Sequence, residues 1–505
     1  MGKWIAVFLL VWFCPLSATA DDSESSGSNQ VPNLFSFDTQ HVGSFGGSSL
    51  NYQAKISNFL LKKNNGDVFA EAVLTSYIVD GEGQRRPVTF VFNGGPGSAS
   101  TWLHMGLMGP KRVRVPSDAS DPGLPPYKLE HNSVALLDLT DLVFIDPIGT
   151  GFSRLAGKGT AEDVFGLEED ASSVAAMVRE WIRREKRWNS PVIIAGESFG
   201  TTRAAAMMPY LQEGPEPIRV SGIIMVSQAM DYTGSTPVND NLIAFATYLP
   251  SLAATAWYHN ALAEKPEDFE KFIDEVRSFT VETYLPALFK GAYLSVSDAD
   301  RIADRLARYT GIDKSYFIKS RLRIPTGRFA KELLRERGTI VGRLDSRYTS
   351  KDVDVMAENP RFDAASAAIS AAYSSSFRAY LHEDLGVSLD RPYFSSGPDV
   401  GANWVYDRRS GYREPSFVNT APTLADAMAR NPGLQVLVAS GYYDLITPFF
   451  DAEFTLARHG IDFSRVKMTY YHAGHMMYVH EPAFKKLTKD IRQFVMEILD
   501  GQGGD

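Results

Sequence analysis

Cysteine is almost absent from this chain of 505 residues, which contains only Cys14. A disulfide framework is therefore excluded, and a chain of this length can be stabilised by a buried core alone. Apolar runs are short, and none has the roughly 20 residues that a membrane-spanning helix needs. Charge is only mildly unbalanced, since 51 basic and 60 acidic residues give a net charge of -9. No nucleic acid is expected as a main partner, because phosphate binding calls for a basic surface.

The composition is that of a globular protein. Hydrophobic residues make up 44% of the chain and charged residues 22%, which excludes extensive disorder. The length allows two or three domains, or one large α/β domain with a long insertion.

The N-terminus has the three-part pattern of a secretory signal peptide. Lys3 precedes the apolar run IAVFLLVWF, and Ala18, Thr19 and Ala20 follow it. We expect residues 1–20 to be a signal peptide cleaved after Ala20; a membrane anchor is the alternative, but the run is about half of a membrane span. The mature chain would be cysteine-free, without a membrane span, and exported, either periplasmic or secreted. A protein of this kind suits a bacterial periplasm better than a eukaryotic secretory pathway.

Hydrophobic patterning predicts an α/β fold. Alternation from Tyr52 to Asp80 indicates an antiparallel hairpin. Beyond it, short continuous apolar runs are typical of strands buried on both faces of a parallel sheet. The runs begin at Pro87, Asp141, Pro191, Val220, Leu434 and Arg465. Helical spacing over Glu162 to Trp188 and over Ala483 to Leu499 places helices after strands, so we expect a doubly wound, mostly parallel sheet.

The strand and helix pattern is interrupted once, and this predicts the domain organisation. We expect a flexible N-terminus over residues 21–50 and the first part of the sheet domain over 51–230. Residues 231–423, rich in helical patterns and aromatic residues, are predicted to form a large, mainly helical cap inserted over the carboxyl edge of the sheet. Residues 424–505 complete the sheet domain.

A candidate nucleophile lies in the pentapeptide Gly196–Gly200, which has the pattern G-x-S-x-G. It directly follows the apolar run PVIIA and directly precedes a helix-forming run. Small residues in this position let the chain turn sharply from strand to helix, and the turn exposes the hydroxyl of Ser198.

A serine nucleophile needs a histidine base and an acid that orients it, in the order serine, acid, histidine for this strand-turn-helix arrangement. Asp444 ends one apolar run and His475 follows another, so both are delivered to the same edge as Ser198. Asp451 competes as the acid. Two further histidines compete as the base, namely His472 and His480.

The glycine-rich turn Asn93–Gly97 follows another apolar run, VTFVF. Its backbone can approach a substrate closely because glycine has no side chain. Together with the N–H of Phe199, it could donate hydrogen bonds to an oxyanion. A tight turn without a ligand is the alternative interpretation.

Five motifs together resemble the serine carboxypeptidases, in order and through about half of the chain. They are NGGPGSAS from Asn93, DPIGTGFS from Asp146, GESFGTTRAA from Gly196, SGYYDLITP from Ser440 and HAGHM from His472. The resemblance implies an α/β-hydrolase fold with a catalytic triad of Ser198, Asp444 and His475, and an oxyanion hole made by Gly95 and Phe199. It implies no metal and no cofactor.

The resemblance also implies that Asn93 and Glu197 bind the terminal carboxylate of a peptide substrate that has a free C-terminus. A protonated Glu197 can donate to a carboxylate, whereas an ionised one repels it, so activity is expected to favour acidic pH. The alternative is that Glu197 is a tolerated variable position. Two residues depart from the family pattern: Ser98 stands where cysteine is common, and Phe199 where tyrosine is common.

The expected activity is release of C-terminal amino acids from peptides through an acyl-enzyme on Ser198. An acyltransferase or esterase acting on small exported metabolites is the alternative, and a non-catalytic binding protein is a third. The segment from Arg301 to Gly338 carries 11 Lys and Arg residues. It could steer carboxylate substrates toward the site, or it could be a solvated helix face.

Overall fold

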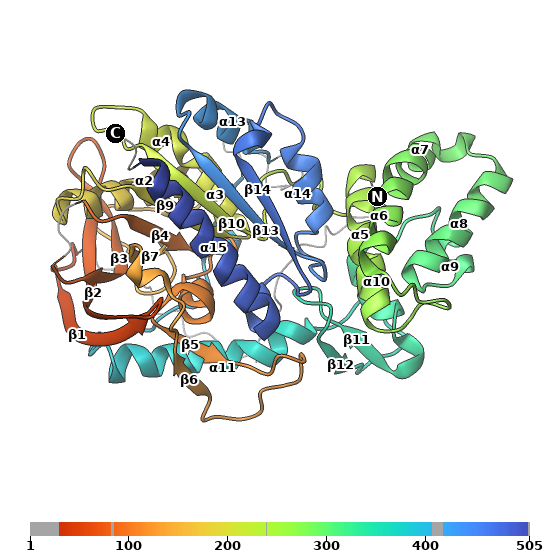
Figure 1. Cartoon of the computed structure of the whole chain (residues 1–505), viewed down its shortest axis with the longest axis horizontal. Coiled ribbons are helices and arrows are strands. Elements are labelled where there is room, and N and C mark those ends of the chain that lie inside the picture. The colour runs from red at the N-terminus through yellow and green to blue at the C-terminus, as the bar shows by residue number, and fades with distance from the viewer. Residues whose placement is uncertain (1–29, 82–84, 239, 407–417, 503–505) are drawn as a thin grey trace, which may run out of the picture.

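The computed structural model describes residues 30–81, 85–238, 240–406 and 418–502, and Figure 1 shows their arrangement. The predicted signal peptide, residues 1–20, lies outside the described residues. Within the described part of the chain, no helix is both long enough and apolar enough to cross a membrane.

The centre of the protein is a twisted sheet in the order β1-β2-β3-β7-β4-β9-β10-β13-β14, with the short β8 paired to β3. The strands are β1 Ser36–Phe45, β2 Ser48–Lys62, β3 Val68–Val79, β4 Val88–Phe92, β7 Asp141–Asp146, β8 Arg154–Leu155, β9 Val192–Glu197, β10 Val220–Val226, β13 Gln435–Gly441 and β14 Val466–Tyr471. From β7 to β14 every neighbouring pair is parallel. Each predicted apolar run forms one of these parallel strands, and the β4, β7 and β9 strands are buried at every position, as continuous apolar runs require.

The expectation of a flexible N-terminus up to residue 50 is wrong from Ser36 onward. The strand β1 pairs with β2 along its whole length, from Ser36 opposite Ser57 to Phe45 opposite Ser48. The side chain of Phe45 is completely buried. β1 is an edge strand whose exposed face is polar except at Val42, so its sequence lacks the apolar run that marks the central strands.

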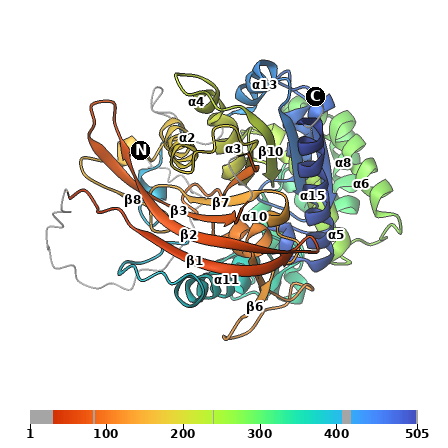
Figure 2. The same cartoon turned by 60° about the vertical axis from the view of Figure 1, so that its left-hand side comes forward.

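Helices cover both faces of the sheet (Figure 2). One face carries helices that share a hydrophobic cluster with the sheet: α2 Leu167–Arg184, α3 Phe199–Ala206, α4 Met208–Gln212, α13 Ala421–Arg430 and α14 Phe449–Leu456. The other face carries α1 Thr101–Leu103, α11 Ala364–Glu383 and α15 Glu481–Gln502. A small hairpin of β5 Lys111–Arg114 and β6 Lys128–His131 and the short α12 Val400–Asn403 complete the sheet domain.

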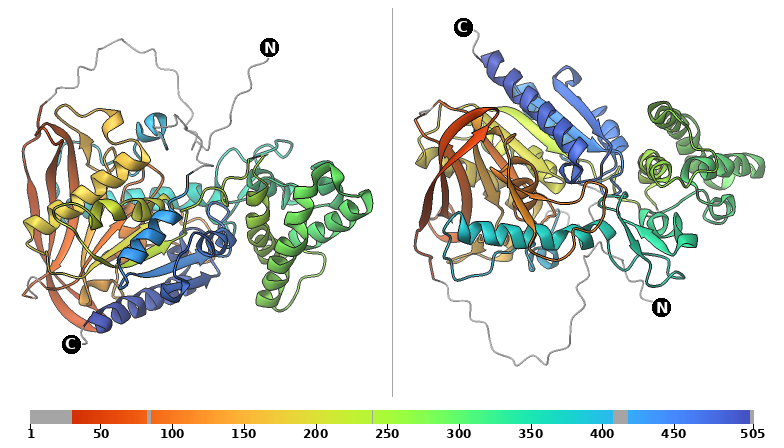
Figure 3. Two further views of the ribbon diagram at one scale, coloured as in Figure 1. Left: turned by 90° about the horizontal axis from the view of Figure 1, so that it is seen from above. Right: turned by 60° about the horizontal axis from the view of Figure 1, so that its bottom comes forward.

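A helical unit projects from one side of the sheet domain, as Figures 1 and 3 show. It contains α5 Leu242–Tyr258, α6 Phe269–Phe279, α7 Leu285–Lys290, α8 Val296–Thr310, α9 Lys314–Lys319 and α10 Thr326–Glu332, followed by a hairpin of β11 Thr339–Val341 and β12 Thr349–Lys351. These helices have a hydrophobic cluster of their own. It includes Tyr442, Tyr443 and Leu445 from the end of β13, so the unit is anchored beside the sheet edge.

The predicted cap over residues 231–423 is two structures rather than one. Its second half returns to the sheet domain, where α11 buries Tyr373, Phe377 and Tyr380 in the same cluster as the sheet. The ring of Phe377 lies 5.0 Å from that of His104. A helical apolar pattern shows that a helix has a face to bury but does not show against which element, so the sequence could not separate α11 from the projecting helices.

Candidate active site

Ser198 lies at the sharp turn between β9 and α3. Its backbone has φ 59° and ψ -129°, a strained conformation for a residue with a side chain. Its N–H donates to the Val226 carbonyl at 2.9 Å. The turn requires glycine at Gly196, because a Cβ there would lie 2.5 Å from the carbonyl oxygen of Gly200. Glu197 and Phe199 are buried while Ser198 is partly exposed, so the turn presents the Ser198 hydroxyl as a nucleophile elbow does.

Asp444 and His475 are in direct contact at the same edge of the sheet. His475 Nδ1 lies 2.7 Å from Asp444 Oδ2, and Asp444 is completely buried. Asp444 follows β13, and His475 follows β14, the neighbouring parallel strand. Their carboxyl ends therefore deliver both side chains to one place. Of the predicted competitors, Asp451 accepts from Thr455 at 3.3 Å, and His472 Nδ1 lies 3.2 Å from the Tyr443 hydroxyl. The acid that His475 contacts is Asp444.

Three donors fix the Asp444 carboxylate. The N–H groups of Ile446 and Thr447 donate to Oδ1 at 2.7 and 3.0 Å. The Thr447 hydroxyl donates to Oδ2 at 2.7 Å. Burial acts to lower the pKa of His475, but the adjacent Asp444 charge and hydrogen bond outweigh it and raise the pKa overall. A histidine held in this way is oriented and made more basic, as a general base requires.

Neighbouring residues hold Ser198 and His475 at the same edge of the sheet. The Ser227 hydroxyl, just beyond β10, donates to the His475 carbonyl at 2.7 Å. The charge of His475 acts on Glu197, the residue before Ser198. Between Ser198 and His475 themselves, both of which are described, the structure contains no hydrogen bond. Because His475 Nδ1 faces Asp444, Nε2 is the nitrogen available to Ser198, and such contacts often tighten only when substrate binds.

The glycine turn after β4 packs directly on the elbow. A Cβ on Gly94 would lie 2.4 Å from the Phe199 nitrogen, so only glycine permits this approach. Gly95, the next residue of the turn, has φ 108° and is exposed. The Asn93 side chain secures the turn by accepting from the Leu103 N–H at 3.0 Å. The two predicted oxyanion donors thus come from segments in backbone contact.

A buried ion pair supports the turn and the elbow from beneath. Arg203 on α3 lies 2.5 Å from Asp170 on α2, and the Arg203 side chain is fully buried. The same guanidinium donates to the Asn93 carbonyl at 2.6 Å. Arg203 therefore connects α3, which directly follows Ser198, with the turn that carries Gly95.

Glu197 is buried beside the nucleophile, with 3% of its surface exposed. Burial raises its pKa to about 7, although the charge of His475 and hydrogen bonds from Tyr478 and Asn93 act in the opposite direction. The Tyr478 hydroxyl donates to Glu197 Oε2 at 2.8 Å. Glu197 and Asn93, the two residues predicted to bind a carboxylate, are therefore neighbours.

A family model described as serine carboxypeptidase matches residues 77–272, a stretch that contains the Asn93 turn and Ser198. Over this segment the chain is similar to the serine carboxypeptidase family. The structure is similar to that of Kex1(delta)p, a prohormone-processing carboxypeptidase from Saccharomyces cerevisiae, with a TM-score of 0.56 and 16% identity over 89% of this chain and 92% of that chain. The predicted α/β-hydrolase fold is thereby confirmed, and the family match supports a serine-type carboxypeptidase.

More distant likenesses include two esterases. One is a putative aryl esterase from Burkholderia cenocepacia, with a TM-score of 0.37 and 13% identity over 88% of this chain and 99% of that chain. The other is a carboxyl esterase from Bacillus coagulans, with a TM-score of 0.35 and 12% identity over 88% of this chain and 98% of that chain. None of the curated proteins matches the chain.

Sequence reasoning missed two members of this candidate site. Thr447 shares Asp444 Oδ2 with His475, and Tyr478 holds Glu197. Both lie three residues beyond a predicted site residue, Asp444 and His475 respectively. Thr447 could have been predicted, because a threonine three residues after a carboxylate can donate to it. The contact between Tyr478 and Glu197 could not, because it joins positions 281 residues apart.

Proposed function

We propose that the protein is a serine carboxypeptidase, which releases C-terminal amino acids from peptides through an acyl-enzyme on Ser198. His475 takes the Ser198 proton as the hydroxyl attacks the last peptide carbonyl, and Asp444 stabilises the imidazolium that forms. The N–H groups of Gly95 and Phe199 receive the oxyanion. His475 then protonates the leaving amine, and water deacylates Ser198. The observation that carries this proposal is the 2.7 Å contact between His475 and Asp444 at the edge where Ser198 is exposed.

The buried Glu197 supports exopeptidase specificity at acidic pH. With its pKa at about 7, Glu197 is protonated in mildly acidic solution and can donate to the terminal carboxylate of a peptide. As pH rises through this value, Glu197 ionises and repels that carboxylate. The KM for substrates with a free carboxylate should therefore rise with pH, and Asn93 provides a second polar contact that does not titrate.

The decisive experiment is Ser198→Ala, assayed with a blocked dipeptide and with a fluorophosphonate probe. Hydrolysis should fall by about 10⁴-fold or more, and labelling should disappear. Ser297→Ala, an exposed serine on α8, is the matched control and should leave both unchanged. Hydrolysis that persists in Ser198→Ala, with the protein folded by circular dichroism, would rule out the assigned nucleophile.

An acyltransferase or esterase acting on small exported metabolites is the alternative, because the same triad serves those reactions. Two blocked dipeptides separate the possibilities, one with a free carboxylate and one with an amide in its place. A carboxypeptidase that uses Glu197 and Asn93 as proposed strongly prefers the free acid at about pH 5. Equal rates on both would favour the alternative.

We also propose that the protein is exported, to a periplasm or to the medium, after cleavage following Ala20. The support is the order of Lys3, the apolar run and the small residues before the cleavage point. Mass spectrometry of the mature protein should find Asp21 as its first residue. An intact Met1 in the exported fraction would contradict cleavage.

A further inference from the structure

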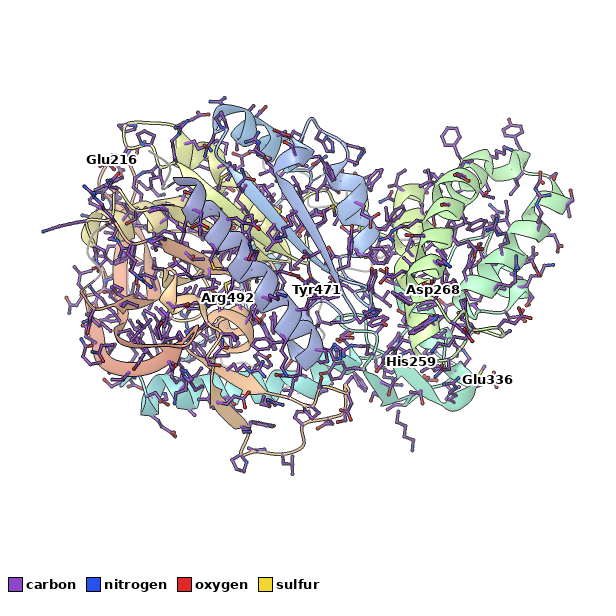
Figure 4. All side chains as sticks on the ribbon, viewed as in Figure 1. Glu216, His259, Asp268, Glu336, Tyr471 and Arg492 are labelled. Atoms are coloured by element: carbon purple, nitrogen blue, oxygen red, sulfur yellow. The ribbon has the colours of Figure 1, made fainter. Side chains whose placement is uncertain are left out.

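The loop of residues 342–348 binds the main chain of the proposed base. The His475 N–H donates to the Leu344 carbonyl at 2.8 Å. On the other side of the loop, the Ser346 carbonyl lies 2.5 Å from His259 Nε2, directly after α5. His259 is labelled in Figure 4, at the junction between the sheet domain and the projecting helices. The position of His475 therefore depends on this loop as well as on β14.

The carboxylate of Asp363 holds the loop in place. Its Oδ2 accepts from the Arg343 N–H at 2.5 Å and from the Leu344 N–H at 3.2 Å. Its Oδ1 accepts from the Ser366 N–H at 2.8 Å, so Asp363 is also the N-cap of α11. Leu344 is thus bonded to Asp363 through its N–H and to His475 through its carbonyl.

Packing against the sheet domain fixes Asp363 at the start of α11. Figure 1 shows α11 beginning beside the hairpin of β11 and β12 and continuing along the sheet domain. Ala365, in its first turn, belongs to the same hydrophobic cluster as Met476, the residue after His475. A Cβ on Gly342 would lie 3.1 Å from the Ala365 nitrogen, so the loop also approaches the helix closely. A carboxylate held on this helix can therefore position the loop and, through it, His475.

Asp363 also places a negative charge near the imidazole of His475. Burial acts to lower the pKa of His475, while the charge and hydrogen bond of Asp444 and the charges of Glu197 and Asp363 act to raise it. Glu197 is neutral in mildly acidic solution, because burial raises its pKa to about 7. This leaves Asp444 and Asp363 to stabilise the imidazolium that forms when Ser198 gives up its proton.

The ion pair of Asp345 and Arg347 is the other charged group that packs against the base segment. The two side chains are buried and lie 2.6 Å apart, so the pair is neutral as a whole. A Cβ on Gly474 would lie 2.4 Å from the Asp345 Cβ, which places the pair against the residue before His475. His480 also faces this pair, and burial lowers its pKa to about 4. Neither the pair nor neutral His480 adds a net charge beside His475.

Two arginines adjoin Asp363 without neutralising it. Arg361 lies 3.7 Å from Asp354, another carboxylate. Arg343 contacts Asp363 through its main-chain N–H. Burial raises the pKa of the Tyr248 hydroxyl, and the charge of the Arg343 side chain opposes that rise. In the part of the chain that the structure describes, no cationic side chain forms an ion pair with Asp363, so its charge is available to His475.

We propose that Asp363 is a positioning residue for His475, which it holds through the loop of residues 342–348 and whose charged form it stabilises. The inference rests on the proposed role of His475 as the general base. It gives a catalytic purpose to a carboxylate outside the triad. The alternative is that Asp363 caps α11 and does nothing more.

The test is Asp363→Asn, assayed with a blocked amino-acid ester that has no free carboxylate. Asparagine caps a helix as well as aspartate does, so the variant keeps the cap but loses the charge and the acceptor for the loop. The ester avoids the separate pH dependence that Glu197 gives to free acids. We expect kcat to fall by about fivefold or more while KM stays within about twofold. The acid limb of kcat/KM should move to lower pH by about half a unit, because His475 becomes less basic.

Two further variants separate charge from position. Asp363→Glu keeps the charge but alters the reach of the carboxylate, so kcat should fall while the acid limb stays at its wild-type pH. Asp363→Ser also keeps a helix cap and removes the charge, so its limb should move as in Asp363→Asn.

Asp268→Asn is the matched control. Asp268, labelled in Figure 4, is the N-cap of α6 and accepts from the Lys271 N–H at 3.1 Å, as Asp363 does from the third residue of α11. The control should leave both kcat and the acid limb unchanged.

The outcomes distinguish this inference from the proposed function. A wild-type protein whose Ser198 is not labelled by a fluorophosphonate would count against the function itself. If Ser198 is labelled, an acid limb that stays in place in folded Asp363→Asn or Asp363→Ser overturns the role of Asp363, and a lowered Tm alone would leave it as a helix cap. An equal shift in Asp268→Asn also overturns the proposal, because any lost charge would then have the same effect.

Discussion

The Tyr478 hydroxyl donates a 2.8 Å hydrogen bond to Glu197 Oε2, and each of the two residues is only 3% exposed. Tyr478 lies three residues after His475, so the loop that carries the base also holds the residue predicted to read the substrate carboxylate. Space for the ring exists because residue 106 is glycine: a Cβ there would lie 2.3 Å from the Tyr478 ring. One loop therefore positions both the histidine base and the glutamate that is predicted to bind the substrate carboxylate.

Tyr478→Phe should extend activity to higher pH. The hydrogen bond from Tyr478 lowers the pKa of Glu197, so its removal lets that pKa rise above its value of about 7. Protonated Glu197 then persists to higher pH, and the increase in KM for a free-acid dipeptide shifts upward. The measurement is KM against pH for that substrate. An ester substrate without a free carboxylate is the control and should show no shift. A downward shift would contradict the role of Tyr478.

Glu197→Gln should make the protein more stable than the wild type at about pH 8 but not at about pH 4. The folded pKa of Glu197 is about 7, above an unfolded value of about 4.3. The folded state therefore binds more protons between these values, and wild-type stability falls as pH rises through that window. Glutamine has no such dependence. Thermal unfolding of both proteins should show a Tm difference that grows from pH 4 to pH 8; a constant difference would mean that Glu197 does not titrate in this range.

Thr447→Val should weaken catalysis and stability together. It removes the hydroxyl that donates to Asp444 Oδ2 at 2.7 Å and leaves a fully buried carboxylate one donor short. The free energy of unfolding should fall by about 1–3 kcal/mol, and kcat should fall while KM changes little. Thr447→Ser, which keeps the hydroxyl, is the matched control and should retain most of the activity. Equal losses in both variants would assign the effect to packing.

Asp170→Leu should destabilise the fold by about 3–5 kcal/mol, because it leaves the buried guanidinium of Arg203 without its counter-charge. The double variant Asp170→Leu with Arg203→Met removes both charges and should be more stable than the single variant. Chemical denaturation of the wild type and both variants gives the comparison. If the double variant is no better than the single one, the cost comes from shape or from the lost Arg203 bond to the Asn93 carbonyl.

The local sequence was sufficient to predict a strand or helix when the same pattern of burial runs along the whole segment. The β9 run is buried at every position, and its apolar continuity alone indicated a central strand. The helix α2 was also predictable. Its first turn carries Glu168, Glu169 and Asp170 and its last turn Arg183 and Arg184, in agreement with the helix dipole. β1 was missed because an edge strand needs few apolar residues, and its pairing with β2 is what orders it.

The sequence by itself determined the parts of this protein that depend on neighbours in the chain: the strands and helices of the sheet domain, and the turn that exposes Ser198. It also placed Asp444 and His475 at strand ends, since parallel strands end at a common edge. Only the tertiary structure decided that Tyr478 reaches Glu197 and that α11 leaves the helical unit for the sheet. Burial and pairing between distant segments are properties of the packed molecule, and no periodicity along the chain encodes them.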